Sequence, residues 1–186
     1  MVAHPKETTV TVKDYLALEE TSEVKHEYVH GYVYAMSGGT INHDAIANAV
    51  RAEIYIHLRG GPCAVRGPDV RLRVNDDVYY YPDAIVTCDK TISGAAIEVT
   101  TPRLVVEVLS ESTEANDRGD KFADYQTLGT FEEYLLVNAR RRSVERFRRT
   151  AQGHWTYQRY TPHDTVTLDT IGLTCPVATF YDATAL

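Results

Sequence analysis

The sequence predicts a mixed α+β fold, organised as a single domain over residues 1–186. Length and composition are those of one globular domain, with 44% hydrophobic and 24% charged residues. The local patterns run in the order helix, strands, helix, strands, helix, strands, which is typical of a sheet flanked by helices. In addition, the apolar run Leu104–Leu109 has the character of a strand buried on both faces.

The N-terminal part predicts a helix followed by a hairpin. Thr9–Glu20 has an apolar side at helical spacing, and Val24–Met36 is rich in residues that favour strands. His30–Gly31 offers the turn between the two arms. Glu27 lies in the first arm, where it either pairs with a cross-strand Lys or His or takes part in catalysis.

A long helix is expected next, from Ile41 to Leu58. Thr40 can cap its first turn, and its apolar positions follow helical spacing at Ile46, Val50 and Ile54. His43 falls on the same side, one turn earlier. A single His on an apolar face is commonly a satisfied core or capping residue, and a functional role is the alternative.

Two strands are predicted after this helix, Cys63–Val74 and Val78–Cys88, with a turn at Asn75–Asp77. Pro82 cannot donate to a strand ladder, so the second strand should be bulged or unpaired just before Asp83. That interruption would aim the Asp83 carboxylate out of the sheet. The alternative is an ordinary turn-region Asp on an edge strand.

An exposed loop, Asp89–Pro102, leads to the strand Leu104–Leu109, which carries a carboxylate at Glu107. Burying an ionised Glu without compensation costs on the order of several kcal/mol, so a cation should meet it. The alternatives are an edge position or a structural Arg partner for Glu107. The rest of the chain must supply the cation.

A third helix is predicted from an N-cap at Asp117 through Leu128. On that helix Lys121 shares a face with Tyr125 and Leu128, because these positions are separated by three or four residues. If the aromatic and apolar side chains face inward, Lys121 points toward the core as well. The alternative is a surface lysine whose stem covers apolar neighbours.

The C-terminal third predicts further strands, at Phe131–Asn138, Ser143–Arg149, Trp155–Tyr160 and Val166–Leu168, the last two forming a hairpin, with an irregular tail over Ile171–Leu186. Six arginines lie between Arg140 and Arg149, opposed only by Glu145. This basic turn could track phosphates. A solvated hairpin paired with acidic neighbours is the equal alternative.

Composition narrows the function further. The net charge of −7 argues against a protein held to nucleic acid by bulk charge, so such a role needs a local basic face or a bound divalent metal. Cys63, Cys88 and Cys175 are scattered, which argues against a disulfide framework or a zinc site and favours reduced thiols. With neither a secretion signal in Met1–Lys13 nor a long apolar run, a cytoplasmic location is expected.

Asp83 and Glu107 lie on two predicted strands, ahead of a helix that carries Lys121. Because adjacent strands lie about 4.8 Å apart, carboxylates at matching heights can share one small cation. Oxygen ligands with positions left open for water suit Mg²⁺, which lowers the pKa of its water and polarises a phosphoryl oxygen. A nearby lysine could orient or deprotonate that water, or stabilise the developing charge.

These residues carry a family resemblance. Pro82-Asp83 followed by Glu107-Val108-Leu109 resembles the signature of the PD-(D/E)XK nuclease superfamily, the restriction-endonuclease-like fold. The lysine of that signature normally stands where this chain has Leu109. Some branches carry it on the following helix instead, and the segment from Val105 to Lys121 is similar to one of them, a large bacterial family of small restriction endonucleases of mostly unknown role.

The resemblance extends over nearly the whole chain and implies an αβββαβ core, with an extra N-terminal helix and hairpin and C-terminal β-hairpins. It also implies that Asp83 and Glu107 bind a metal, Mg²⁺ or Mn²⁺, with the Val108 carbonyl completing the shell. Lys121 would be the catalytic lysine. The remaining site positions that match the family are two candidates, Glu27 and His43, and two supporting or capping residues, Asp117 and Tyr125.

The function implied is a divalent-metal-dependent endonuclease that hydrolyses phosphodiester bonds, with DNA as the substrate, by attack of a metal-activated water. A homodimer is expected, because two symmetric sites allow cuts in both strands. One alternative is a module on a nuclease-like fold that binds nucleic acid or protein without cutting. Another is a metal-dependent hydrolase of a small phosphoester, which fits the acidic charge but not the resemblance.

Overall fold

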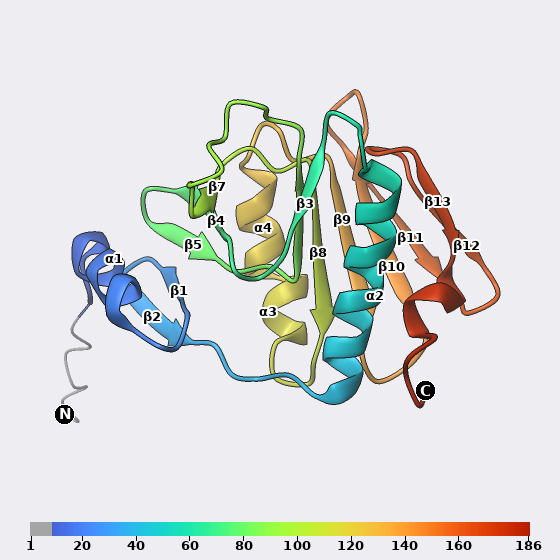
Figure 1. Ribbon diagram of the computed structural model, residues 1–186, viewed down its shortest axis with the longest axis horizontal. Helices are drawn as coiled ribbons and strands as arrows, with labels where there is room; N and C mark the ends of the chain where they lie inside the picture. The colour runs from blue at the N-terminus through green and yellow to red at the C-terminus, as the bar shows by residue number, and fades with distance from the viewer. Residues whose placement is uncertain (1–8) are drawn as a thin grey trace, which may run out of the picture.

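The computed structural model describes residues 9–186 and contains two large sheets with helices packed against them (Figure 1). The first eight residues of the predicted domain lie outside the described part. The helices are α1 (Val12–Thr21), α2 (Ile41–Leu58), α3 (Glu114–Arg118), α4 (Asp120–Gln126) and the 3-10 helix η1 (Val177–Tyr181). Within the described residues, no helix is both long enough and apolar enough to cross a membrane.

Each strand within residues 9–186 belongs to one of three sheets. In spatial order, the six-stranded sheet contains β11 (Trp155–Tyr160), β10 (Val144–Arg149), β9 (Glu133–Asn138), β8 (Leu104–Leu109), β6 (Ala84–Thr87) and β3 (Ala64–Arg66). The five-stranded sheet contains β2 (Tyr32–Ala35), β1 (His26–Val29), β5 (Val78–Tyr80), β4 (Arg71–Asn75) and β7 (Glu98–Val99). A small third sheet pairs β12 (Thr165–Leu168) with β13 (Leu173–Pro176).

The predicted αβββαβ core is confirmed. Helix α2 precedes β3, β6 and β8, which pair antiparallel in that order. Helices α3 and α4 then return the chain to β9, which pairs parallel with β8. Helix α2 has the predicted bounds and the predicted cap, because the Thr40 hydroxyl accepts the His43 N–H at 3.2 Å.

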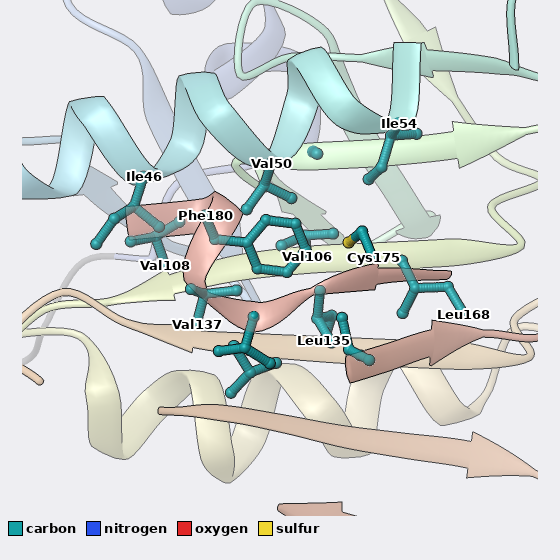
Figure 2. Close-up of a cluster of buried hydrophobic side chains, with 14 of the residues drawn as sticks. Ile46, Val50, Ile54, Val106, Val108, Leu135, Val137, Leu168, Cys175 and Phe180 are labelled. Carbon is teal, nitrogen blue, oxygen red and sulfur yellow. The ribbon is translucent and has the colours of Figure 1, made fainter. Parts of the chain in front are cut away.

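The six-stranded sheet is covered on both faces, and each face has its own apolar core. Side chains alternate along β8, so Val106 and Val108 pack against α2 and the C-terminal segment (Figure 2). Val105 and Leu109 pack on the opposite face with α4 and the five-stranded sheet. Glu107 has the same parity as these two, and the alternation therefore places its carboxylate on the α4 side.

The two long strands predicted after α2 are each divided between the two sheets. The first becomes β3 and β4, and the second becomes β5 and β6, so the predicted turn at Asn75–Asp77 joins only β4 to β5. Pro68 and Pro82 lie in the two breaks, where neither can donate a ladder hydrogen bond. The predicted interruption before Asp83 is thus present, and it marks a change of sheet rather than a local bulge.

Several boundaries differ from the prediction because tertiary pairing overrides local pattern. Strand β11 pairs with β10, whereas β12 pairs with β13, which lies inside the predicted irregular tail. The loop before β8 contains the short strand β7, which pairs parallel with β4. The third predicted helix is two short helices separated at Gly119, and Asp117 lies inside α3 rather than at an N-cap.

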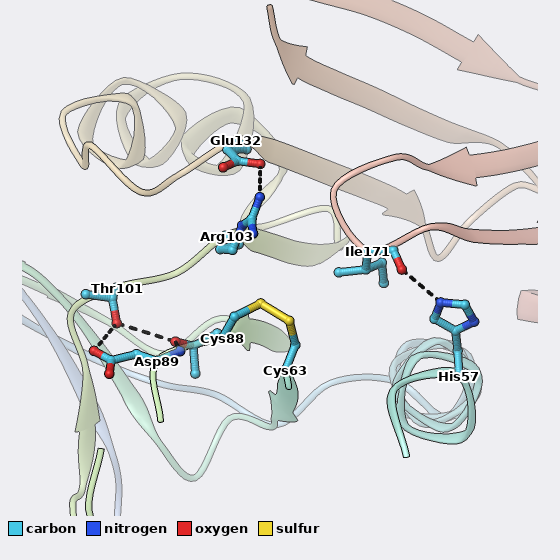
Figure 3. Close-up of a disulfide and its surroundings, with 9 residues drawn as sticks. His57, Cys63, Cys88, Asp89, Thr101, Arg103, Glu132 and Ile171 are labelled. Carbon is cyan, nitrogen blue, oxygen red and sulfur yellow. Dashed lines mark hydrogen bonds and ion pairs between the residues drawn. A yellow bond between two sulfur atoms is a disulfide. The ribbon is translucent and has the colours of Figure 1, made fainter. Parts of the chain in front are cut away.

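The prediction of three reduced cysteines is wrong for two of them. Cys63 and Cys88 form a disulfide across a separation of 25 residues (Figure 3). The β3–β6 register pairs Ala64 with Thr87, and its next step places the two cysteines opposite each other. Because the two cysteines lie 25 residues apart in sequence, no local motif indicated that they pair. Cys175 is a free, buried thiol.

Candidate active site

Asp83 and Glu107 meet at the end of the β6–β8 pairing. The register joins Ala84 to Val106, so the next step places Asp83 opposite Glu107. The Asp83 carboxylate continues the interaction between the strands, because its Oδ2 accepts the Val108 N–H at 2.7 Å. Asp83 immediately precedes β6 and lies at the height of Glu107 on β8, which is the arrangement that would let the two carboxylates share a cation.

Lys121 supplies the cation that the apolar strand around Glu107 requires. Its Nζ lies 3.3 Å from Glu107 Oε1 and 2.8 Å from Glu27 Oε1, with the residue only 5% exposed. The ammonium also lies 5.2 Å from the centre of the Tyr80 ring, in a cation–π arrangement. The structure therefore excludes the alternative of a surface lysine.

Glu107 is held by a second donor besides Lys121. The Tyr125 hydroxyl, one helical turn beyond Lys121 on α4, donates to Glu107 Oε1 at 3.0 Å. Burial raises the pKa of Glu107 well above its usual range, against the opposing charge of Lys121. Burial alone would lower the pKa of Lys121, but the surrounding carboxylates outweigh it and raise that pKa well above its ordinary value.

Glu27 reaches the site from β1, which belongs to the five-stranded sheet. Its Oε1 makes the shortest contact to Lys121 and also accepts the Tyr81 backbone N–H at 3.3 Å. A cross-strand lysine or histidine was the alternative partner for Glu27. The observed lysine instead belongs to a helix of the core, so the N-terminal hairpin contributes directly to the site.

His43 lies beside Asp83 at the N-terminal end of α2. Its Nε2 is 3.6 Å from Asp83 Oδ2. A Cβ at Gly39 would lie 2.9 Å from His43 Nδ1, so the absence of a side chain at Gly39 leaves room for the imidazole. His43 is therefore placed at the site rather than in the apolar core between α2 and the sheet.

Sequence reasoning underestimated what two residues, Asp117 and Arg51, contribute to this site. Asp117 was expected to cap a helix, yet its carboxylate is buried with Oδ1 3.4 Å from Lys121 Nζ. The four-residue spacing from Asp117 to Lys121 was the available signal. Arg51 donates from α2 to the Asp83 carbonyl at 3.1 Å, and its position in the sequence carried no indication of that contact.

The site holds more acidic groups than basic ones. Three carboxylates contact the Lys121 ammonium, those of Glu27, Glu107 and Asp117, and a fourth, that of Asp83, lies beside His43. Burial raises the pKa of Asp83 and of Asp117 as well as that of Glu107. Within residues 9–186, Asp117 Oδ1 accepts no hydrogen bond. Additional positive charge would offset this excess.

A hard divalent cation fits this donor set only with backbone and water ligands. No group of three or more His, Cys, Asp or Glu side chains in the described chain is arranged to hold a metal. Two carboxylates and a carbonyl, completed by water, are nevertheless a suitable set for Mg²⁺. The Val108 N–H faces Asp83, and both backbone groups of a strand residue face the same neighbour, so the Val108 carbonyl lies on that side too.

The basic turn is largely a paired hairpin. Arg146 is buried, with Nε 2.8 Å from Glu133 and Nη2 2.6 Å from Asp169. Arg140 pairs with Glu114 on α3. These contacts support the structural alternative for those arginines. Arg141 and Arg142 have exposed side chains, and phosphate contact stays a prediction for them.

The fold, with Asp83 at the start of β6, Glu107 on the adjacent strand β8 and Lys121 on the helix α4, is that of restriction-endonuclease-like nucleases. The family model of Uma2, described as "Putative restriction endonuclease", matches residues 12–178. The chain therefore belongs to the Uma2 family.

Two relatives and one solved structure extend this comparison. The uncharacterized protein slr1290 of Synechocystis sp. (strain ATCC 27184 / PCC 6803 / Kazusa) is 37% identical over 185 residues, 97% of each chain. The uncharacterized protein sll1609 of the same strain is 28% identical over 149 residues, 78% of this chain and 84% of the relative. A crystal structure from Anabaena variabilis ATCC 29413, titled as a putative nuclease belonging to DUF820, superposes with a TM-score of 0.77 at 16% identity, covering 93% of this chain and 98% of that one. At this identity the likeness shows the fold alone.

Proposed function

We propose that the protein is a divalent-metal-dependent endonuclease that hydrolyses phosphodiester bonds in DNA. The observation that carries this proposal is the meeting of Asp83, Glu107 and Lys121 in one buried site. The family supports it, because its description names an endonuclease. The excess of acidic groups supports metal binding, since a divalent cation would offset charge that Lys121 alone leaves uncompensated.

The carboxylates of Asp83 and Glu107, with the Val108 carbonyl, would hold Mg²⁺ or Mn²⁺. When bound, such a metal supplies Lewis-acid polarisation of a phosphoryl oxygen and a lowered pKa for water. The Val108 N–H orients Asp83, and the Tyr125 hydroxyl orients Glu107. These contacts set the two ligands in place before substrate arrives, which lowers the cost of organising the site.

Lys121 is best suited to stabilise negative charge on the phosphate in the transition state. Its contacts with Glu27, Glu107 and Asp117 favour the charged ammonium over the neutral amine, and an ammonium is a poor base for removing a proton from water. Glu27 fixes the ammonium by the shortest of its carboxylate contacts. His43 places its Nε2 3.6 Å from Asp83 Oδ2, beside one of the two proposed metal ligands.

Plasmid cleavage tests this assignment. Wild-type protein should cut plasmid DNA with Mg²⁺ or Mn²⁺, and Asp83→Ala or Lys121→Ala should lower the rate by about 100-fold or more. Lys90→Ala is the matched control, because Lys90 is exposed, and it should cut at the wild-type rate. Cleavage that survives both site substitutions would contradict the proposed site.

A second candidate is a binding module on the nuclease fold. Because the net charge of −7 gives no bulk attraction for DNA, such a module would bind it through a local basic face, and Arg141 and Arg142 are exposed. A wild-type protein that shifts DNA in a gel but leaves plasmid intact with both metals would support this candidate over the nuclease. A hydrolase of small phosphoesters would instead cleave bis(p-nitrophenyl) phosphate and leave plasmid uncut.

A further inference from the structure

The backbone of Asp83 lies just beyond the point where β6 stops pairing with β3. The Val86 carbonyl accepts the Arg103 N–H from the segment that enters β8, so Val86 faces β8. Successive residues of a strand face opposite neighbours, and the Asp83 carbonyl therefore faces the β3 side. Strand β3 has already ended there, because its last paired residue, Arg66, lies opposite Ile85.

Arg51 occupies the place of the missing strand partner. Its Nη1 donates to the Asp83 carbonyl at 3.1 Å, and its Nη2 donates to the Asn48 side chain one turn earlier on α2. Gly67 lies against the arginine stem, since a Cβ at Gly67 would be 3.4 Å from Arg51 Cδ. The guanidinium is thus held from two sides while it binds the backbone of Asp83.

Asp83 is consequently fixed at both of its ends. The backbone carbonyl is held by Arg51, and the carboxylate is held by the Val108 N–H at 2.7 Å. Pro82, immediately before it, has no N–H with which to tie the preceding backbone to a strand. The hydrogen bond from Arg51 therefore helps to fix the backbone of Asp83 and, with it, the direction of the Asp83 carboxylate.

We propose that Arg51 is a positioning residue that sets the Asp83 carboxylate for metal binding. The proposal rests on the function proposed above, because it gives Asp83 the role of a metal ligand. Arg51 acts through Asp83 and needs no contact with substrate. The planar guanidinium binds the carbonyl and Asn48 together, which the single ammonium of a lysine cannot reproduce with the same geometry.

The first test needs neither metal nor activity. The exchange rate of the Val108 amide hydrogen, followed by NMR in the metal-free protein, reports whether Asp83 still accepts that N–H. Arg51→Ala should raise this rate at least about 10-fold, with Arg51→Lys between it and wild type. Arg66→Ala is the control, because Arg66 is an exposed arginine on the neighbouring strand, and it should leave the rate unchanged. Unchanged amide exchange in Val106 and Leu135 would show that the core is intact.

The second test is Mn²⁺ affinity, measured from the metal-dependent rise in Tm. Arg51→Ala should weaken it about 10-fold or more, and Arg51→Lys should recover part of the loss. If Arg51→Ala does not fold, Arg51→Gln and Arg51→Lys replace it in both measurements. Val108 exchange or Mn²⁺ affinity equal to wild type in the folded variants would overturn the positioning role. A wild type without any Mn²⁺ effect on Tm would instead contradict the proposed function, while Val108 exchange would still judge whether Arg51 orients Asp83.

Discussion

At the scale of single residues, burial decides the chemistry of this site. Lys121 and Glu107 are 5% and 4% exposed, so neither charge is stabilised by bulk water. Removing one partner of a buried ion pair costs about 3–5 kcal/mol, because it leaves the other charge uncompensated. Lys121 is thus required by the fold as well as proposed for catalysis. Loss of activity in its variants must be compared with loss of folding.

A second ion pair, away from the site, gives a pH-dependent prediction. Arg118 donates two hydrogen bonds to Glu145, from Nη1 at 2.6 Å and from Nη2 at 2.8 Å, and they lower the pKa of Glu145 below its usual value. A carboxyl group whose pKa is lower in the folded state stabilises the fold above its unfolded pKa of about 4.3, and that stabilisation is lost as pH falls through the folded pKa.

Glu145→Gln should therefore lower the free energy of unfolding by about 1–2 kcal/mol at pH 7. The difference from wild type should shrink as pH falls below about 4. Urea denaturation at several pH values measures both effects. Glu111→Gln is the control, because Glu111 is exposed, and it should match wild type throughout. A constant difference between Glu145→Gln and wild type from pH 7 to pH 3 would rule out the charged pair as its cause.

At the scale of elements, the site depends on how short segments are joined. Strand β6 has four residues, with Asp83 immediately before it and Cys88 immediately after it. Its neighbour β3 is a three-residue edge strand, held by three register pairs and by the disulfide (Figure 3). Asp83, a proposed metal ligand, therefore precedes a strand, β6, whose edge neighbour β3 is held to it partly by the Cys63–Cys88 disulfide.

Breaking the disulfide should lower stability measurably. Closing a loop of this length is worth about 3 kcal/mol in the chain-entropy description. For a chain of this size that corresponds to a Tm change of roughly 6–12 °C. Cys63→Ser combined with Cys88→Ser should show this decrease, and a reductant should produce it in wild type but not in the double variant. A wild-type Tm that is insensitive to reductant would contradict the prediction. So would a thiol titration of the non-reduced wild type that finds Cys63 and Cys88 free as well as Cys175.

At the scale of the whole molecule, the two sheets meet at the site. The six-stranded sheet supplies Glu107, α4 supplies Lys121, and the five-stranded sheet supplies Glu27 through β1. The N-terminal hairpin is thus an integral part of the site, although it lies outside the αβββαβ core (Figure 1). We infer that truncation before α2 would remove the shortest carboxylate contact to Lys121.

We also propose the homodimer that the sequence led us to expect, because a symmetric pair of sites can cut both strands of a duplex. Light scattering after size-exclusion chromatography should give about twice the chain mass of 20.9 kDa at concentrations that cleave plasmid. A single-chain mass under cleaving conditions would reject the dimer and predict nicked rather than linear plasmid as the first product.

Local sequence patterns were sufficient to predict helix α2, the strand that carries Glu107, and the inward direction of Lys121. Periodicity and turn residues act over a few positions, and each of these features depends on such short-range preferences. The resemblance of Pro82-Asp83 and Glu107 to a known signature then predicted the order of helices and strands in the αβββαβ core. Sequence alone therefore determined the central fold and the three residues on which the proposed function rests.

Only the tertiary structure decided the division of the strands between two sheets, the disulfide, the contact of Glu27 with Lys121, and the contact of Arg51 with Asp83. Each of these joins segments whose pairing depends on which surfaces remain unburied once the core has formed. Glu27 meets Lys121 across 94 positions because β1 pairs with β5 in the second sheet. Long-range burial selects such contacts, and no local preference encodes them.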